Sequence, residues 1–440
     1  MRTRKMTSLV GGVAALTLLL AACGDDDNGD TTSDDDTTQD EDEGDEDPGD
    51  DDMALSGDLT VWIMQPGEDV LATLEDTADA FEAEHEGVTI NYESIPWDGG
   101  HDQFVTAIAG GQVPDLAELG NTWLLEFAEQ GAIAPVEWPE GEEFVPGLAD
   151  SAVLDGANYG FPWYAGVRAL IYRTDVFEEA GVEVPTTWDE LLEVGDTIAA
   201  EVDDIAPIRA AGVYQHMYQP LIWGFGGDIA TQDGDTWTPG FDTDEGHAAL
   251  EFFNTLWEKG WSPEGAVQWN SVDVRDDFAN GGAAMMIGGG WDLTAILGAN
   301  PDLEGNLGTA LLPAGPSGNR DSFAGGSHLG VFAESDQQEL AQAYGEFMVS
   351  AEQVAAFTGS EGFLPGTVGG VEAAVGGDEL YGAFADQYLE HSRFYPIGGW
   401  WGQAEGAAVI PNEVQKLMLG EQTVQETAAA IDAGLAGQID

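Results

Sequence analysis

The first part of the folded region alternates short apolar runs with amphipathic stretches. "LTVWI" at 59–63 and "GVTINYESI" at 87–95 predict strands, and "FVTAIAGGQVPDLAELG" at 104–120 predicts a helix, a turn and a third strand. Between the first two strands, helical spacing aligns Val70, Leu74, Ala78 and Phe81. This β-α-β-α-β order predicts a mostly parallel sheet covered by helices, and hence an α/β fold.

Polar and aromatic residues follow each of the three predicted strands directly. Gln65 follows the first strand, Trp97 and Asp98 follow the second, and Asn121 and Trp123 follow the third. Ligands on parallel sheets bind beyond the carboxyl ends of the strands. We therefore expect these side chains to converge at one edge of the sheet and to contact a ligand.

A second set of elements begins after residue 165. "ALIYR" at 169–173 predicts a strand, and "GFPWYAGV" before it is expected to place Trp163, Tyr164 and Arg168 in and beside a loop at the mouth of that strand. "GAAMMIGGGWDLTAI" at 282–296 predicts a buried strand, a glycine-rich loop and a helix. The sequence thus indicates a second α/β region.

Two capping boxes mark helix starts in this second region. Thr187 with Glu190, and Thr423 with Glu426, have the Ser/Thr-x-x-Glu spacing in which the side chain and backbone of two residues cap each other. "SFAGGSHLGVFAES" at 322–335 predicts a further strand. We expect helices to begin at both boxes.

The N-terminus has the pattern of an export signal. Residues 1–22 begin with basic side chains and continue as an apolar run from 9 to 22, which is too short to span a bilayer as a permanent helix. The run ends in "LAAC", which resembles the bacterial lipobox and implies cleavage before Cys23 and a diacylglycerol on its sulfur. An ordinary signal peptide with an unmodified cysteine is the less favoured alternative. The prediction is a protein anchored by lipid to the extracellular face of the cell membrane.

The segment at 23–54 predicts a disordered tether behind the lipidated cysteine. Residues 24–52 contain no aromatic, aliphatic or basic side chain and 17 acidic ones, so they cannot bury apolar surface and they repel one another. Fully extended, this segment reaches roughly 100 Å. The folded body is expected to stand away from the membrane.

The acidic excess continues through the body. The chain has 83 Asp and Glu against 11 Lys and Arg, which leaves 66 acidic and 8 basic residues after residue 52. Nucleic acid is excluded as a partner because phosphate binding needs a basic surface, and membrane contact is expected only through the lipid. Self-repulsion of this size is tolerable in strong salt, so the composition predicts a salt-adapted, halophilic protein. A cationic ligand would be the alternative reason for the acidity.

Metal and cofactor chemistry has no support in the sequence. Cys23 is the single cysteine, which removes disulfides, zinc knuckles and iron–sulfur clusters, and the six histidines form no HExxH spacing. Neither a P-loop nor a GxSxG motif occurs. We expect no metal, no cofactor and no enzymatic activity.

Three longer segments carry a resemblance to a known family. "AIAGGQVPDLAELGNTW", "YRTDVFEEAGVEVPTTWDEL" and "GGAAMMIGGGWDLTAI", in this order, resemble the family 1 extracellular solute-binding proteins of ABC sugar importers, the maltose-binding-protein group. The resemblance covers about residues 56–440 and implies a two-lobe periplasmic-binding-protein type II fold with a hinge that the chain crosses more than once. Lobe one would comprise 55–165 plus 322–365, and lobe two 166–321 plus 366–440.

This family resemblance also implies a function. A carbohydrate, with an oligosaccharide expected, would bind in the cleft and close the lobes around the hinge. The monomeric receptor would then dock on ABC permease subunits whose ATPase is a separate chain, because this chain has no P-loop.

Sugar recognition gives the aromatic candidates their roles. A pyranose has an apolar face that stacks on an aromatic ring and a rim of hydroxyls that planar polar side chains bind. The resemblance implies that Trp291 stacks on sugar, that Trp163 and Tyr164 line the cleft beside the hinge, and that one of Trp400 and Trp401 faces the ligand while the other packs inward.

Three further candidates each have two interpretations. Arg168 offers five donors to sugar hydroxyls or pairs with a carboxylate at the hinge. Asp292 accepts from sugar hydroxyls or caps a helix, and Trp223 lines the site or lies in the core. Four other tryptophans are expected to serve packing: Trp62, Trp188, Trp257 and Trp261.

The sequence departs from the maltose binders at one informative place. A glutamate that binds sugar in those proteins aligns near Gly166, which puts maltose itself in doubt. Two other functions stay open at this point. A lipid-anchored glycoside hydrolase would need two carboxylates at a defined separation, and the same fold could bind a polyamine through its acidic and aromatic side chains.

Overall fold

The computed structural model describes residues 55–65, 68–97, 99–234, 236–375, 379–396 and 398–439. Residues Ala54–Asp440 form one compact unit. The predicted signal segment 1–22 and the predicted tether 23–54, including Cys23, lie outside the described residues.

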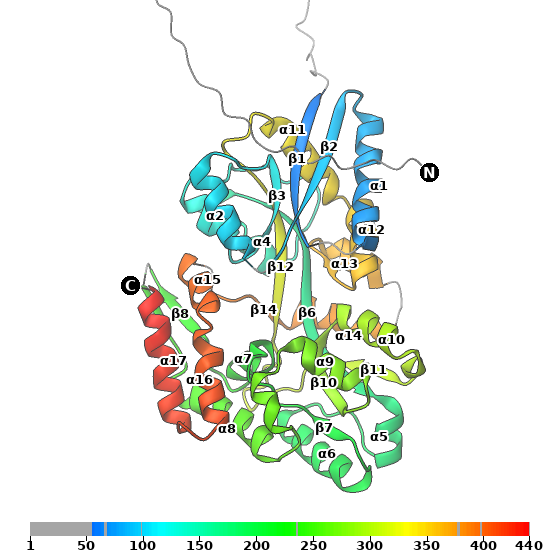
Figure 1. Ribbon diagram of the computed structural model, residues 1–440, viewed down its shortest axis with the longest axis vertical. Coiled ribbons are helices and arrows are strands. Elements are labelled where there is room, and N and C mark those ends of the chain that lie inside the picture. The colour runs from blue at the N-terminus through cyan, green and yellow to red at the C-terminus, as the bar shows by residue number, and fades with distance from the viewer. Residues whose placement is uncertain are drawn as a thin grey trace, which may run out of the picture. The chain divides into compact units, whose positions relative to one another are not determined.

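A parallel sheet is built from the first three predicted strands (Figure 1). Its strands are β1 (Gly57–Met64), β2 (Val88–Ile95) and β3 (Leu116–Gly120), and β1 lies between the other two. β12 (Ser322–Val331) adds to the free edge of β3 in antiparallel orientation. The order β2-β1-β3-β12 confirms the predicted strands and brings together residues more than two hundred positions apart.

Side chains on the two faces of β1 belong to two separate cores. Leu59, Val61 and Ile63 pack against α1 (Glu68–Glu84) and α11 (Gln338–Met348), whereas Trp62 and Met64 point to the opposite core, which includes α2 (Gly100–Gly110). Successive side chains in a strand point to opposite faces, and a strand covered by helices on both faces is apolar throughout. This explains the apolar run from Val61 to Met64, in which both faces are buried.

One long strand, β6 (Phe161–Arg173), joins the two halves of the sheet. Its first half pairs with β12 and with β13 (Leu364–Pro365), and its second half pairs with β10 (Ala283–Gly289) and β11 (Leu307–Ala310). β6 and β12 run side by side between the two halves in Figure 1. The prediction of a loop at Trp163 and Tyr164 was therefore wrong: these residues lie within β6, where partners on both edges satisfy the backbone.

The other strands complete the sheet or form small hairpins. β7 (Ala206–Ile208) pairs with β10, and β14 (Ser392–Arg393) pairs with β12. Two hairpins lie apart from the sheet: β4 (Val153–Leu154) with β5 (Ala157–Asn158), and β8 (Ala230–Asp233) with β9 (Thr236–Pro239).

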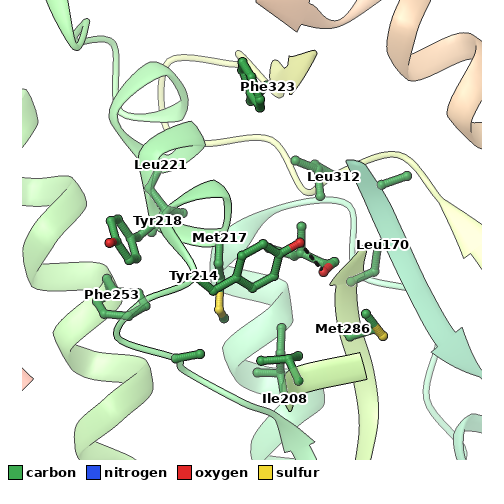
Figure 2. Packing of buried hydrophobic residues seen from close by; sticks show 14 of the residues in the cluster. Leu170, Ile208, Tyr214, Met217, Tyr218, Leu221, Phe253, Met286, Leu312 and Phe323 are labelled. Carbon is green, nitrogen blue, oxygen red and sulfur yellow. Dashed lines mark hydrogen bonds between the residues drawn. The ribbon is translucent and has the colours of Figure 1, made fainter. Parts of the chain in front are cut away.

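Helices cover both halves of the sheet. Those not yet named, apart from two short 3-10 turns, are α3 (Leu124–Glu129), α4 (Pro146–Asp150), α5 (Thr174–Ala180), α6 (Trp188–Glu201), α7 (Gln215–Gly224), α8 (Asp244–Glu258), α9 (Ser271–Ala279), α10 (Gly290–Ala299), α12 (Ala351–Glu361), α13 (Val368–Val375), α14 (Glu379–Glu390), α15 (Gly399–Gly406), α16 (Val409–Met418) and α17 (Val424–Ile439). Figure 2 shows part of the larger core, where Tyr214, directly before α7, points toward Leu170 of β6 and Met286 of β10.

Both predicted capping boxes are present. Thr187 accepts from the backbone of Glu190, whose carboxylate accepts from Thr187 in return at the start of α6, and Thr423 and Glu426 do the same before α17. The prediction of a glycine-rich loop after the strand at 283–289 was wrong, because β10 is followed directly by α10. Three consecutive glycines allow this abrupt change from strand to helix.

Candidate ligand-binding site

The carboxyl ends of the three parallel strands meet, as expected. The rings of Trp97 and Trp123 lie 5.5 Å apart, and the backbone N–H of Trp97 donates to Oε1 of Gln65 at 3.4 Å. Trp97 is 42% exposed, which leaves much of its ring accessible. Gln65 has a φ of 39°, a left-handed conformation that is uncommon for a residue other than glycine. Asp98, predicted beside Trp97, lies outside the described residues.

A cavity of about 150 Å³ lies at these strand ends. Its lining is mostly apolar or aromatic, with one amide and one carboxyl group: Met64, Gln65, Trp97, Glu118, Tyr164, Phe357 and Phe363, with Ile63 and Val70 behind them. Pockets for whole ligands usually measure about 300–1,000 Å³. This cavity therefore suits one part of a larger molecule.

Glu118 forms the buried floor of this cavity and was not predicted as a site residue. Its side chain accepts from the backbone N–H of Met64 at 2.9 Å, from Oγ of Ser327 at 2.7 Å and from the hydroxyl of Tyr164. Burial raises the pKa of Glu118, although these three donors oppose the shift. The available signal was an acidic residue inside the apolar strand "LAELG", whose five residues are all buried.

Trp163 and Tyr164 lie in the strand rather than at its mouth. Trp163 is 1% exposed and its ring stacks on Phe357 at 4.2 Å, so it lies in the core behind the cavity. Tyr164 lines the cavity and its ring contacts Phe363 at 4.7 Å. Of the two residues predicted to line the cleft, only Tyr164 reaches the cavity in this structure.

Trp291 and Arg168 form a second group of site residues. Trp291, half-buried at the start of α10, contacts Phe363 with the ring centroids 5.3 Å apart. The guanidinium carbon of Arg168 lies 5.1 Å from the centroid of the Trp291 ring, 5.7 Å from that of Phe323 and 6.0 Å from that of Tyr214, to whose hydroxyl its Nε donates. Arg168 is thus held among three aromatic rings by cation–π contacts.

Asp292 caps a helix, which is one of its two predicted roles. Its Oδ2 accepts from the backbone N–H of Gly289 at 2.9 Å, and the residue is only 3% exposed. Burial raises the pKa of Asp292, whereas the Gly289 hydrogen bond and the charge of Arg168 lower it. The side chain stabilises the start of α10 and thereby the position of Trp291.

The two tryptophans of α15 face different neighbours. Trp401 is 1% exposed and contacts Tyr395 at 4.8 Å, whereas Trp400 lies against Trp237 at 5.5 Å. α15 lies close to the start of α3: a Cβ on Gly402 would be 3.9 Å from Trp123, the residue before α3, and one on Gly399 would be 3.4 Å from Glu126. Trp401 therefore packs inward, and Trp400 lies nearer to the surface of the site.

Trp223 and Asn121 have structural contacts. Trp223 is 2% exposed and its indole N–H donates to Asp228 at 3.1 Å, which agrees with the core interpretation. The amide oxygen of Asn121 accepts from the backbone N–H of Gly326, and its own backbone N–H donates to the Gly326 carbonyl, so it joins β3 to β12. The four tryptophans predicted to pack, Trp62, Trp188, Trp257 and Trp261, all lie in or against a core.

Ring contacts, the cavity lining and Arg168 together link these aromatic side chains into one series, here called the aromatic belt. It begins with Trp97 and Trp123 at the strand ends and continues along the cavity to Phe363. From there it follows the rings around Arg168 to α15, and α15 in turn lies close to Trp123. Its members are Trp97, Trp123, Phe363, Trp291, Phe323, Tyr395, Trp400 and Trp401. Both halves of the fold contribute to it.

A second carboxyl group that the sequence did not single out lies beside the belt. Glu405 of α15 accepts from Nε2 of Gln215 at 3.0 Å, and burial raises the pKa of Glu405 to about 7. Next to it, Nδ1 of His216 and the hydroxyl of Tyr395 are 2.6 Å apart. Burial, aided by the charge of Arg168, lowers the pKa of His216, which keeps this imidazole neutral. One glutamate among so many acidic residues gives no signal in the sequence.

Two features are absent from the described ranges. No group of three or more His, Cys, Asp or Glu side chains there could hold a metal ion. No helix in the described part of the chain is both long enough and apolar enough to cross a bilayer.

The fold and this site define a class of protein. Residues 66–355 match the family described as bacterial extracellular solute-binding protein, and the chain belongs to this family. It is accordingly a two-lobed α/β binding protein and not an enzyme, as predicted.

Individual relatives support the same assignment. The diacetylchitobiose-binding protein DasA of Streptomyces coelicolor is 30% identical over 368 residues, which cover 82% of each chain. The GacH receptor of Streptomyces glaucescens, solved unliganded and with acarbose, is similar with a TM-score of 0.75 and 25% identity over 88% of this chain and 99% of that one. The sugar-binding protein MalE of Xanthomonas citri has a TM-score of 0.75 and 27% identity, covering 87% and 98%.

Proposed function

We propose that the protein captures an oligosaccharide at the aromatic belt and delivers it to an ABC importer. The belt itself carries this proposal. Aromatic faces stack on the apolar faces of pyranose rings, and the few polar groups among them, Gln65 and Arg168, bind hydroxyls at the rim. Because both halves of the fold contribute side chains, a bound sugar would bridge them.

The names of the relatives support a carbohydrate ligand. They include proteins that bind diacetylchitobiose, arabinooligosaccharide and maltotriose, and a receptor solved with acarbose. Their variety leaves the identity of the sugar to experiment, and Gly166 argues against maltose. Family membership removes the glycoside hydrolase alternative, whereas a polyamine is an outcome that the test must separate.

Anchoring and delivery complete the proposal. We propose that Cys23 carries a diacylglycerol, that the acidic segment 24–52 tethers the monomeric body outside the cell, and that separate permease and ATPase chains supply transport. Expression of the full chain and of Cys23→Ser with a radiolabelled fatty acid tests the anchor. Label and membrane association that persist in Cys23→Ser would contradict it.

A ligand screen tests the sugar proposal. The compact unit 54–440 is melted in about 2 M NaCl with gluco-, malto-, xylo-, chito- and galacto-oligosaccharides and with spermidine. A ligand at 100 times its Kd stabilises by about 2.7 kcal/mol, which is readily measured. We expect one sugar series to raise the Tm, Trp291→Ala to abolish this shift, and Trp269→Ala, a half-buried tryptophan outside the belt, to retain it.

The other results of this screen would contradict the proposal in distinct ways. A shift with spermidine alone would assign the aromatic residues to a cation site. Chromatography that revealed shorter sugars after incubation would indicate hydrolysis instead of binding. No shift with any compound would refute the sugar assignment while leaving the fold unaffected.

A further inference from the structure

A second and larger cavity lies beyond Trp400. It measures about 370 Å³ and is lined by α4, by the β8–β9 hairpin and by residues 392–396. On α4, a Cβ on Gly147 would lie 2.5 Å from Phe394, so a glycine at this position lets the Phe394 ring pack directly against the helix. This volume falls within the range of about 300–1,000 Å³ that ligand pockets usually have.

One face of the hairpin forms an aromatic wall of this cavity. Ala230 and Gln232 of β8 line it, as does Trp237 of β9, which pairs directly with Gln232. Alternate residues of a strand share a face, so Thr231 and Thr238 lie on the other side of the hairpin. The ring of Trp237 meets that of Trp400 edge-on at 5.5 Å. The aromatic wall of the cavity therefore contacts the aromatic belt at Trp400.

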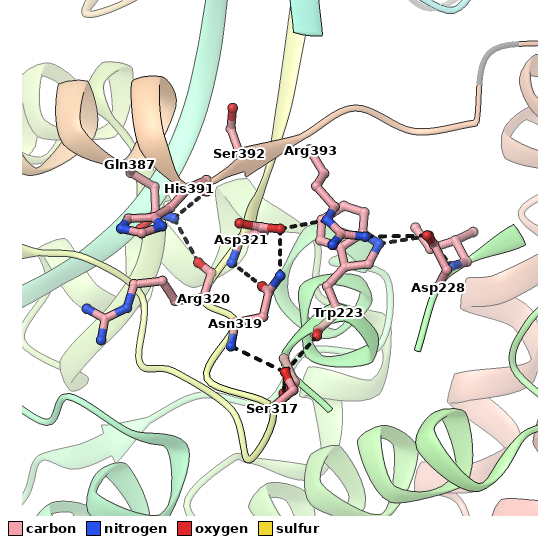
Figure 3. Close-up of polar contacts among 12 residues, drawn as sticks. Trp223, Asp228, Ser317, Asn319, Arg320, Asp321, Gln387, His391, Ser392 and Arg393 are labelled. Carbon is pink, nitrogen blue, oxygen red and sulfur yellow. Dashed lines mark hydrogen bonds and ion pairs between the residues drawn. The ribbon is translucent and has the colours of Figure 1, made fainter. Parts of the chain in front are cut away.

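Arg393 supplies a fixed polar group to the same cavity (Figure 3). Its Nε donates to Asp321 at 2.6 Å and its Nη1 donates to Asp228 at 3.4 Å, while its guanidinium lies 5.9 Å from the Trp223 ring centroid. Both carboxylates are held in turn, Asp321 by Asn319 at 2.7 Å and Asp228 by Trp223 at 3.1 Å.

The Arg393 guanidinium is thus held in position while some of its hydrogen-bond donors stay unpaired within the described part of the chain. Its contacts among the described residues employ two of its five donors, and the Arg393 side chain is 41% exposed. A group held in place in advance loses less entropy when it binds a ligand. The remaining donors are available to the oxygen atoms of a ligand.

The charges around the cavity favour a neutral ligand over an anionic one. Arg393 contributes one positive charge, whereas Asp228, Asp321 and the nearby Asp150 contribute three negative ones. An anionic ligand would be repelled by this excess, while neutral hydroxyls can donate to the carboxylates and accept from Arg393. An aromatic wall opposite a polar group is the arrangement that a neutral sugar ring requires.

We propose that this cavity, here called the Arg393 pocket, is an additional subsite that binds a further neutral sugar unit of the oligosaccharide. Trp237 stacks on the apolar face of that unit, and Arg393 with Asp228 binds its hydroxyls. This inference rests on the proposed function and deepens it. The protein would accordingly distinguish ligands by length, because only a chain that extends past Trp400 reaches the pocket.

Calorimetric titration of an oligosaccharide length series tests the subsite. Malto- and chito-oligosaccharides of one to five units are titrated into unit 54–440 as the wild type, Trp237→Ala, Arg393→Gln and the control Thr238→Ala. We expect wild-type affinity to rise with chain length. Trp237→Ala and Arg393→Gln should each reduce the affinity for the longest sugar by about tenfold, the loss of one stacked or charge-assisted contact, and leave the affinity for the shortest bound sugar unchanged.

Three other results would overturn the inference, each for a different reason. Equal losses for short and long sugars in variants that melt like the wild type would place Trp237 and Arg393 in the main site. An undiminished length dependence in both variants would show that the pocket binds no sugar. If the wild type bound no member of either series nor of the wider screen, the proposed function itself would fail.

Discussion

The indole of Trp291 lies in the space that a side chain at residue 166 would occupy. A Cβ on Gly166 would lie 2.9 Å from Cη2 of Trp291, closer still to its Cζ3, and 3.2 Å from Phe363. Gly289 faces the same ring in the same way. Two glycines therefore form the surface on which the predicted sugar-stacking tryptophan rests.

Gly166→Ala should displace the indole and weaken ligand binding. Overpacking of this kind costs about 1–3 kcal/mol, so we expect a lower Tm and an affinity for the bound sugar reduced by about tenfold or more. Gly110→Ala is the matched control, because a Cβ at that exposed helical position meets no atom within 4 Å. Melting and calorimetry measure both effects. Unchanged affinity in Gly166→Ala would show that the position of Trp291 does not limit binding.

Glu118→Ala should destabilise the protein strongly. The substitution leaves the hydroxyls of Tyr164 and Ser327 and the N–H of Met64 without their acceptor, and each unpaired buried group costs about 1–3 kcal/mol. We expect a loss of more than about 3 kcal/mol in urea unfolding, and a smaller loss in Glu118→Gln, which retains one acceptor oxygen.

Glu93 provides the control for Glu118. It is an exposed acidic residue of β2 in the same sheet, so Glu93→Ala removes an acidic side chain without leaving a buried group unpaired. We expect its urea midpoint to stay close to that of the wild type. Equal losses in Glu118→Ala and Glu93→Ala would mean that the buried hydrogen bonds add nothing to stability.

The free energy of unfolding should fall as the pH rises from about 4.5 to 7, the range between the ordinary and the folded-state pKa of Glu405. The pKa of Glu405 is about 7 in the folded protein against 4.5 ordinarily. Below about pH 4.5 this carboxyl is protonated in both the folded and the unfolded state. Between pH 4.5 and 7 only the unfolded chain releases its proton. The free energy of unfolding therefore decreases by on the order of 3 kcal/mol by pH 7 and does not decrease further above it.

The comparison with Glu405→Gln isolates this effect. The amide does not titrate, so the free energy of unfolding of the wild type should decline relative to that of the variant from pH 5 to 7.5. Urea unfolding at half-unit pH steps measures the difference, and the exposed Glu352→Gln controls for the loss of one charge. Parallel pH profiles for the wild type and Glu405→Gln would contradict the prediction.

Salt should stabilise the body. Residues after 52 include 66 acidic and 8 basic side chains, and their repulsion is screened as the Debye length falls from about 10 Å at 0.1 M to about 3 Å at 1 M. We expect the Tm of unit 54–440 to rise steadily from 0.1 to 2 M NaCl. A protein of near-zero net charge, melted in the same buffers, provides the baseline. A Tm that follows this baseline would contradict the predicted salt adaptation.

The local elements and the meeting of the strand ends could be predicted from the sequence, because short-range rules govern them. Helical spacing from Val70 to Phe81 defined α1, and side-chain chemistry alone specified the capping boxes at Thr187 and Thr423. Parallel strands must end at the same edge, so the approach of Trp97 to Trp123 followed from the order of the elements.

Only the tertiary structure decided which aromatic side chains reach the site. Trp163 and Tyr164 are neighbours in one strand and both rings contact Phe357, yet Trp163 lies in the core whereas Tyr164 lines the cavity. The three donors to Glu118, the glycine surface under Trp291 and the Arg393 pocket each join residues from distant segments. Such contacts depend on how strands and helices pack in three dimensions, which local spacing along the chain does not specify.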